Sequence, residues 1–215
     1  MESKQKELIH QEIEKKIDDL LQKMTLKEKI GQMTQQGPSL VGGFDLENLI
    51  GKFANGEISS KEFEEIQKQF SENLHEDLIE AGEIGSFLGA SGAEKINRLQ
   101  KIAVEKSRLG IPLLFGMDVI HGYRTIFPTP LAESCCWDLS LMEKSARIAA
   151  KEASADGIRW TFSPMVDICR DARWGRICEG GGEDSYLTSE IAKAKVHGYQ
   201  TDDVSKPDSI AACAK

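Results

Sequence analysis

Short apolar runs alternate with helical stretches from Ile84 onward, and this order limits the folds open to the chain. The apolar runs have strand length and composition and cover residues 84–88, 111–117, 158–165 and 209–214. Helical spacing is found between them, over residues 91–109, 140–155 and 186–199. Strand–helix alternation predicts an α/β fold with a parallel sheet. The run 111–117 is almost continuously apolar, as in a strand buried on both faces.

The first eighty or so residues are predicted to be mainly helical. Apolar residues recur at helical spacing over 8–24, and Thr25-x-x-Glu28 has the form of a capping box that starts a short second helix. The run 30–34 reads as a first strand. A second capping pattern at Ser59 predicts a helix that extends to about Ala81. Residues 40–57 carry scattered glycines, which predicts a loop with short helical pieces.

The composition excludes several classes of protein. With 40% apolar and 29% charged residues the chain is typical of a soluble globular protein and not of a disordered one. The net charge of −8 argues against a nucleic-acid partner, because neutralising phosphates requires clustered Lys and Arg. No apolar run approaches about 18 residues, so we expect no membrane span.

The cysteines and the N-terminus suggest a compartment. Five cysteines are an odd number, and the first residues lack the apolar core of a secretory signal. We therefore expect reduced thiols and a cytoplasmic location. Cys169 and Cys178 flank one loop and could approach each other. We expect no metal site, because no C-x-x-C or suitably spaced histidine accompanies them.

Two of the predicted strands end in an aspartate. Asp118 follows PLLFGM, and Asp167 follows WTFSPMV and opens a loop that contains Arg176. The carboxyl ends of parallel strands share one face, so these loops should converge. Asp118 and Arg176 could then line a pocket where an acceptor and a forked donor suit sugar hydroxyls. A role for Asp118 as a helix N-cap or turn residue is equally open.

The remaining polar residues near these strand ends have simpler interpretations. Arg170 and Arg173 are predicted to brace the loop by pairing with carboxylates. Trp174 either stacks on a ligand or fills the core of the loop. His121 is expected to hydrogen-bond the backbone. The three glycines at 180–182 are not followed by a lysine and do not follow a strand, which disfavours a nucleotide site.

The two long motifs, LGIPLLFGMDVIHGYRTIFPTPLAES and WTFSPMVDICRDARWGRICEGGGEDSYLTSEIAKAKVHGYQ, closely resemble the family 3 glycoside hydrolases of the β-glucosidase type. The resemblance covers residues 17–36 and 84–215, and residues 40–80 look like an insertion. It implies a (β/α)₈ TIM-type barrel followed by a second α/β domain. Residues 1–215 would supply the first four to five β/α units of the barrel, ending inside a barrel strand at Lys215.

The resemblance also implies an activity. Members of the family hydrolyse β-glucosides with retention, using an aspartate nucleophile and a separate acid/base carboxylate about 5 Å apart. Carried over residue by residue, Asp118, Arg176 and Lys215 match positions that contact the sugar in the first subsite. The nucleophile and the acid/base match no position here, so we expect no catalytic residue in the chain and no turnover by it alone.

The expected partners follow from this activity. They are a β-glucoside or oligosaccharide substrate and the missing C-terminal part of the enzyme, with no cofactor, nucleic acid or membrane. Two alternatives stay open. The protein could be a β-xylosidase-type member of the same family, or it could be a non-catalytic sugar-binding or assembly module that retains Asp118 and Arg176.

Overall fold

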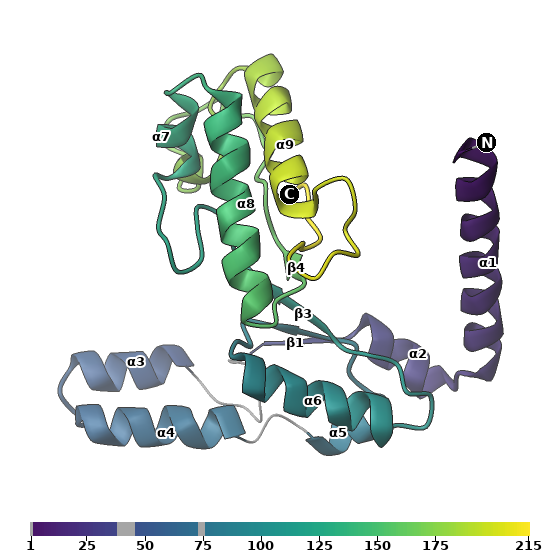
Figure 1. Ribbon diagram of the computed structural model, residues 1–215. Helices are drawn as coiled ribbons and strands as arrows, with labels where there is room; N and C mark the ends of the chain where they lie inside the picture. The colour runs from purple at the N-terminus through teal and green to yellow at the C-terminus, as the bar shows by residue number, and fades with distance from the viewer. Residues whose placement is uncertain (1, 38–45, 73–75) are drawn as a thin grey trace. The chain divides into compact units, whose positions relative to one another are not determined.

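The computed structural model describes residues 2–37, 46–72 and 76–215, and it confirms the α/β class (Figure 1). The elements described before Ser86 are α1 (Glu2–Lys23), α2 (Leu26–Met33), β1 (Gln35–Gln36), α3 (Leu46–Ala54), α4 (Ser60–Glu72) and α5 (Glu76–Glu80). The elements from Ser86 onward are β2 (Ser86–Leu88), α6 (Ala93–Glu105), β3 (Leu114–Met117), α7 (Pro130–Ser134), α8 (Leu139–Ala155), β4 (Trp160–Thr161), the 3₁₀ turn η1 (Ile177–Glu179) and α9 (Ser185–Gln200).

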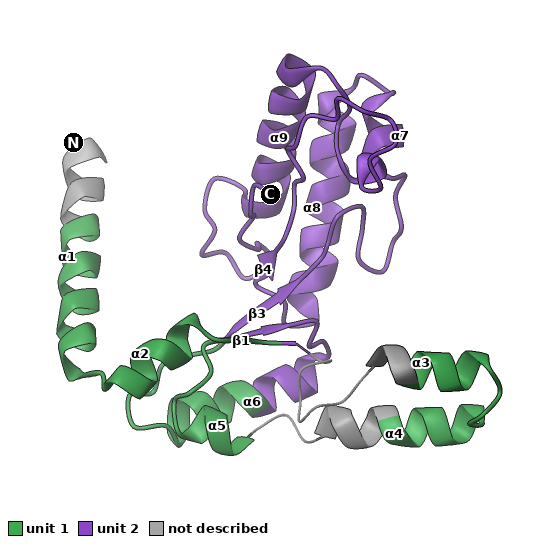
Figure 2. Cartoon of the chain, turned by 180° about the vertical axis from the view of Figure 1, so that it is seen from behind, with its two compact units in different colours: residues 1–36, 41–86, 99–113 green, residues 37–40, 87–98, 114–215 purple. Residues whose placement is uncertain are grey.

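The chain divides into two compact units (Figure 2). Unit 1 comprises Met1–Gln36, Val41–Ser86 and Leu99–Leu113. Unit 2 comprises Gly37–Leu40, Phe87–Arg98 and Leu114–Lys215. Both strands that end in an aspartate belong to unit 2, so the candidate site can be described within that unit alone.

The strands follow the order β1-β2-β3-β4 in the sheet. β3 and β4 pair in parallel, with Gly116 opposite Trp160 and Met117 opposite Thr161, which confirms the predicted parallel sheet. A parallel bridge from Trp160 to Ala211 adds the final extended segment beside β4.

The regular strands are shorter than the sequence predicted. The prediction of a strand over 158–165 is correct only at Trp160–Thr161, since Pro164 has no N–H to donate to a ladder. The segment predicted as a strand at 209–214 forms a single parallel bridge, at Ala211, and is not a regular strand. Leu114 is 40% exposed, so burial on both faces begins only at Phe115.

Two long helices pack side by side in unit 2 (Figures 1 and 2). Gly198 of α9 makes their close approach possible, because a Cβ there would lie 2.4 Å from the carbonyl oxygen of Glu143 in α8. α8 begins at Leu139 with Asp138 as its N-cap, whose carboxylate accepts from the amides of Ser140 and Leu141. The helix was predicted to open at Ser140. It begins at Leu139 instead, because Asp138 is the residue that caps the free amides.

The predicted strand at 30–34 is wrong, since Ile30 and its neighbours belong to helix α2. The capping box predicted at Thr25 is confirmed and starts this helix, with the Glu28 amide 3.3 Å from Thr25 Oγ1. Gly31 lets the helix lie against the segment after α5, because a Cβ on residue 31 would lie 2.2 Å from the Gly82 carbonyl oxygen. A short apolar run does not distinguish a helix from a strand by periodicity alone.

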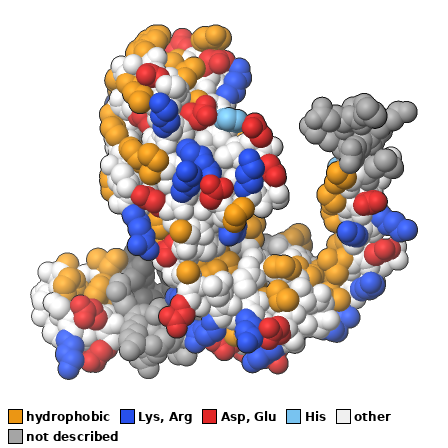
Figure 3. Space-filling view, in the orientation of Figure 1, with side chains coloured by type: hydrophobic (Ala, Val, Ile, Leu, Met, Phe, Trp, Pro, Cys, Tyr) orange, Lys and Arg blue, Asp and Glu red, His pale blue; other side chains and the backbone are white. Residues whose placement is uncertain are grey.

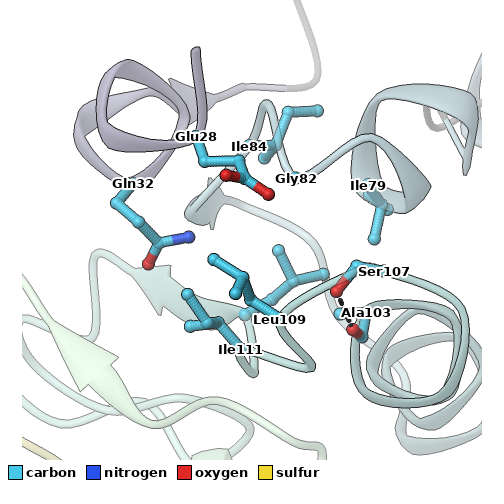
Figure 4. Close-up of a pocket in the computed structure, with 10 residues that line it drawn as sticks. Glu28, Gln32, Ile79, Gly82, Ile84, Ala103, Ser107, Leu109 and Ile111 are labelled. Atoms are coloured by element: carbon cyan, nitrogen blue, oxygen red, sulfur yellow. Dashed lines mark hydrogen bonds between the residues drawn. The ribbon is translucent and has the colours of Figure 1, made fainter. Parts of the chain in front are cut away.

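A charged pair holds the start of α2 against the end of α6 within unit 1. Glu28 is buried, and its carboxylate accepts from Arg108 Nε at 3.0 Å and from a terminal nitrogen of Arg108 at 2.5 Å. Glu28 also lines a cavity of about 10 Å³, together with Gln32 of the same helix and Ser107 (Figure 4). The hydrogen bonds from Arg108 and Thr25 lower the pKa of Glu28 from 4.5 to about 2.

Where the prediction of one helix from Ser59 to about Ala81 can be compared, the described residues form two, α4 and α5. α3 and α4 contact each other, and the rings of Phe53 and Phe63 stack at 4.7 Å. α1 is amphipathic, and its apolar side chains lie along one side of the helix in Figure 3. The parts of the predictions that fall on residues 40–45 and 73–75 lie outside the described residues. That residues 40–80 are an insertion stays a prediction.

We predict that Arg108→Gln destabilises unit 1 at neutral pH and that the difference from the parent shrinks in acid. The folded-state pKa of Glu28 lies near 2, below its ordinary 4.5, so its ionisation stabilises the fold above about pH 4.5. This contribution is lost as the pH falls from about 4.5 to about 2. Thermal unfolding followed by circular dichroism at pH 7, 4.5 and 3 should show a lower midpoint for Arg108→Gln, with most of the difference present at pH 7.

The control is Lys101→Gln in α6, whose exposed partner Glu105 lies 3.9 Å away. Exposed pairs of this kind contribute little, so its unfolding midpoint should stay near that of the parent. Equal behaviour of the two variants would show that the Glu28–Arg108 pair does not stabilise the unit.

Candidate functional site

Two cations and two carboxylates meet at the carboxyl ends of the unit 2 strands. Lys215 Nζ lies 3.4 Å from Asp118 Oδ1 and 3.7 Å from Glu179 Oε2. Arg176 donates to both oxygens of Glu179, at 2.8 and 2.7 Å. The structure therefore brings Asp118, Arg176 and Lys215 together, as the sequence predicted, with Glu179 between the two cations. We call these four residues the charged cluster.

Asp118 is positioned by the main chain that follows β3. The Val119 amide donates to Thr161 Oγ1 of β4 at 3.1 Å, and the Val119 carbonyl accepts from the Tyr199 hydroxyl of α9 at 2.7 Å. Tyr199 is 1% exposed and its hydroxyl lies 3.1 Å from Ser163 Oγ. Burial raises the pKa of Tyr199 to about 12, so the hydroxyl keeps its proton at neutral pH.

Asp118 is not a helix N-cap. The next helix, α7, begins at Pro130 with Thr129 before it. The Asp118 side chain is half exposed and lies next to the Lys215 ammonium. The turn interpretation agrees with the structure, since the Val119 amide donates to the Met117 carbonyl at 3.0 Å across Asp118. That Asp118 also belongs to a site stays a prediction.

Lys215 is held by main-chain pairing with the segment after β4. Its amide donates to the Pro164 carbonyl at 3.0 Å, and its carbonyl accepts from the Val166 amide at 2.8 Å. The extended segments on which Lys215 and Asp167 lie are therefore hydrogen-bonded neighbours. This pairing fixes the direction in which the Lys215 side chain leaves the sheet.

The turn η1, which carries Arg176 and Glu179, rests on α7 and α9. η1 contacts α7, and the glycines that follow it need close approach: a Cβ on Gly181 would lie 3.0 Å from Thr188 Oγ1. Beneath the turn, Lys195 of α9 forms an ion pair with Glu133 of α7, and both side chains are less than 10% exposed. Gly181 thus serves packing against α9, and Gly180 packs against the Asp167 carbonyl.

The charges within the cluster stabilise one another. The hydrogen bonds from Arg176 hold the pKa of Glu179 below its ordinary value, and the Lys215 charge adds to this effect. The hydrogen bond to Glu179 raises the pKa of Arg176, with smaller contributions from Asp167 and Asp118. At neutral pH the cluster thus presents one exposed carboxylate and two oriented cations, a set that can accept from and donate to several hydroxyl groups.

Other predictions for the loop are settled by its contacts. Arg173 pairs with Asp171 at 2.6 Å, which confirms its structural interpretation, although the pair is exposed. His121 Nδ1 lies 2.9 Å from the Phe127 carbonyl oxygen, as expected for a histidine that binds backbone. Cys169 and Cys178 are both free thiols. The prediction that Arg170 braces the loop is wrong, because its side chain makes no ion pair or hydrogen bond with any described residue. Arg170 and Trp174 lie beside an open depression of the same loop.

Three residues that shape the cluster were given no role by the sequence analysis: Glu179, Thr161 and Tyr199. Glu179 is three residues after Arg176. In a helical turn such as η1, an acid at that spacing from an arginine predicts an ion pair between the two. Thr161 and Tyr199 carried no such signal. Their contacts depend on the pairing of β3 with β4 and on the packing of α9, which span long sequence distances.

In the described residues, no group of three or more His, Cys, Asp or Glu side chains has an arrangement that could hold a metal ion. No helix found there is both long enough and apolar enough to cross a bilayer.

A family model described as the glycosyl hydrolase family 3 N terminal domain matches residues 25–215. The chain belongs to this family. The match covers both strand ends that build the charged cluster.

Relatives and solved structures of family 3 extend this result. The periplasmic β-glucosidase of Salmonella typhimurium is 36% identical over 86% of the chain, and the lysosomal β-glucosidase of Dictyostelium discoideum is 29% identical over the same share. The crystal structure of the Listeria innocua β-glucosidase with glucose is 41% identical over 94% of the chain, with a TM-score of 0.72. Proteins named as β-xylosidases also match.

The chain spans only part of these proteins: 20% of the Salmonella protein, 22% of the Dictyostelium protein and 26% of the Listeria chain. The likeness to β-glucosidase structures, together with the parallel sheet, confirms the predicted partial (β/α)₈ barrel.

The prediction of a cytoplasmic location is wrong by this comparison, since relatives are named as periplasmic and lysosomal proteins. The reasoning failed because free thiols and a polar first helix are compatible with any of these compartments. The packing of an α/β unit is the same in each of these cellular compartments and therefore does not report the location.

We predict that Tyr199→Phe destabilises unit 2. The change removes the short hydrogen bond to the buried Val119 carbonyl and leaves it only the longer one from Thr161 Oγ1 at 3.4 Å, and a buried hydrogen bond is worth about 0.5–1.5 kcal/mol. Urea unfolding should show this loss, while Tyr186→Phe, at a 75% exposed position, should leave the unfolding free energy unchanged. Equal stability of Tyr199→Phe and the parent would mean that this hydrogen bond adds no net stability.

Proposed function

We propose that the chain forms one wall of the glucose-binding subsite of a retaining β-glucosidase-like glycoside hydrolase. In this proposal Asp118 accepts hydrogen bonds from sugar hydroxyls, and Arg176 and Lys215 donate to them. The observation that carries the proposal is the convergence of these three side chains on one face of unit 2, with Lys215 Nζ 3.4 Å from Asp118 Oδ1.

The chemistry of the cluster supports a neutral polyol as its ligand. Glu179 already neutralises much of the charge on Arg176, so the cluster is not a strong anion site. Asp118 is half exposed and its contact with Lys215 is long for a charged hydrogen bond, so the pair can open to admit hydroxyl groups. Alternating acceptors and donors are what adjacent ring hydroxyls require.

The relatives indicate the substrate class. The Listeria innocua β-glucosidase has been solved with glucose and, as a variant, with laminaribiose. We infer that a β-glucoside or a β-linked oligosaccharide is the substrate here as well. β-Xylosidase-type activity is the alternative within the family.

In this proposal the reaction itself needs residues that the chain does not supply. The family resemblance assigns the nucleophilic aspartate and the acid/base carboxylate to positions that match none of these 215 residues. The chain would bind the sugar. A further part of the protein would supply both reacting carboxylates, the nucleophile and the acid/base, about 5 Å apart.

The binding proposal is tested by titrating the chain with glucose in a calorimeter. We expect saturable binding that Asp118→Ala reduces at least about tenfold, because a charged acceptor for two hydroxyls is worth more than about 1.4 kcal/mol. The control Asp202→Ala, at a 90% exposed aspartate outside the cluster, should bind like the parent. Absence of glucose binding by the parent chain would refute the proposal.

The catalytic part of the proposal makes a separate prediction. The chain alone should not release 4-nitrophenol from 4-nitrophenyl β-glucoside faster than buffer without protein does, because both reacting carboxylates are assigned to positions outside the chain. The assay is run beside a complete family 3 β-glucosidase as a positive control. Turnover that co-purifies with the chain and is lost in Asp118→Ala would show that it contains a catalytic carboxylate after all.

A further inference from the structure

Two adjacent thiols lie on the surface of unit 2. Cys135 caps the end of α7, and Cys136 follows it in the short turn that leads to α8. Both side chains are exposed and both are free thiols. Their Sγ atoms donate weakly to backbone, from Cys135 to the Leu131 carbonyl at 3.4 Å and from Cys136 to the Asp138 carbonyl at 3.8 Å. Such weak contacts are easily given up, so both sulfurs can turn toward a common ligand.

We propose that Cys135 and Cys136 form a chelating dithiol site for a thiophilic centre that takes two sulfur ligands, namely trivalent arsenic with one organic substituent. The site is separate from the charged cluster and does not rest on the proposed function. When an arsenoxide binds, two As–S bonds form while the As=O bond and the two S–H bonds break. The oxygen and the two protons leave as water, and no atom is oxidised or reduced.

The backbone holds the two cysteines in place before any ligand binds. The amide of Cys135 donates to the Ala132 carbonyl at 3.2 Å, and the amide of Cys136 donates to the Glu133 carbonyl at 3.1 Å. The side chain of Glu133 is itself buried and paired with Lys195 of α9. The turn that presents the thiols is therefore anchored to the interior of unit 2, and the side-chain torsions are the main freedom that chelation has to fix.

The closeness of the two residues favours a bridging atom over a direct disulfide. Adjacent α-carbons are about 3.8 Å apart, whereas those of a disulfide are usually about 4.4–6.8 Å apart. A direct bond between the two sulfurs would therefore be strained. An arsenic atom bound to both sulfurs lengthens the bridge and relieves this strain, so the pair suits a chelated centre.

The surroundings of the pair limit the number of ligands. Over residues 2–37, 46–72 and 76–215, no third His, Cys, Asp or Glu joins the two thiols in an arrangement that could hold a metal ion. Structural zinc takes four ligands, so the pair does not suit it. Sulfur ligands favour soft centres. Arsenic with one organic substituent needs two sulfurs from the protein, and the exposed position leaves room for the substituent in solvent.

Chelation should distinguish this pair from the other cysteines. Once one sulfur is bound, the second bond forms within the same molecule, which can raise the affinity by about 10²–10⁴-fold over a single thiol. Cys178 is exposed but stands alone in η1, Cys213 is half-buried and Cys169 is buried. These three should react as single thiols, whose arsenic adducts are displaced by an excess of another single thiol.

The test treats the whole chain with phenylarsine oxide in an excess of 2-mercaptoethanol and measures the mass of the intact protein. We expect one phenylarsenic group per chain, which ethane-1,2-dithiol removes. Cys135→Ser and Cys136→Ser should each lower the affinity at least about 100-fold, measured by competition with ethane-1,2-dithiol. The matched controls Cys178→Ser and Cys213→Ser should keep the affinity of the parent. Circular dichroism checks the fold of each variant, and alanine replaces serine at a position where serine unfolds the chain.

Three outcomes would overturn the inference. The parent chain could take up no phenylarsenic under these conditions, in which case the two thiols do not chelate. The adduct could survive with unchanged affinity in Cys135→Ser or in Cys136→Ser, which would show that one thiol is enough. The adduct could be lost in Cys178→Ser, which would assign the second sulfur to η1 and reject the adjacent pair as the site.

Discussion

The buried hydroxyl of Tyr199 is the contact on which the geometry of unit 2 depends. It joins the carbonyl of Val119, which follows Asp118, to Ser163, which follows β4, and it does so from α9. Because the hydroxyl keeps its proton, the donor is permanent. The loop after β3 is thereby placed relative to the loop after β4 before any polar side chain of the cluster is considered.

Around this fixed frame the charged cluster is arranged by neighbouring charges. Glu179 orients Arg176 through two hydrogen bonds and lies near Lys215, while Asp118 stays half exposed. The arrangement separates two tasks: Glu179 holds the cations, and Asp118 remains available. Without Glu179, Arg176 would lose both of its hydrogen bonds within the cluster, and Asp118 would be the one carboxylate left for the two cations.

The sequence predicted the class of fold and three members of the cluster because these depend on short-range patterns. Apolar runs that end in aspartate, with helices between them, are readable locally, and the match of Asp118, Arg176 and Lys215 came from motif resemblance. What could not be predicted depends on long-range packing. The hydrogen bond of Tyr199 needs α9 in place, and the helical state of Ile30 depends on the capping box before it and on the fit of Gly31 against Gly82.

The ion pair between Glu133 and Lys195 has a consequence for how this chain can vary. Both side chains are almost completely buried beneath η1, and Ser145 donates to the same carboxylate. Losing one partner leaves an uncompensated charge in the interior, whereas exchanging both for apolar side chains of similar volume is close to neutral. The two positions, one on α7 and one on α9, are therefore free to change only together, and among homologous chains they should be either both charged or both apolar.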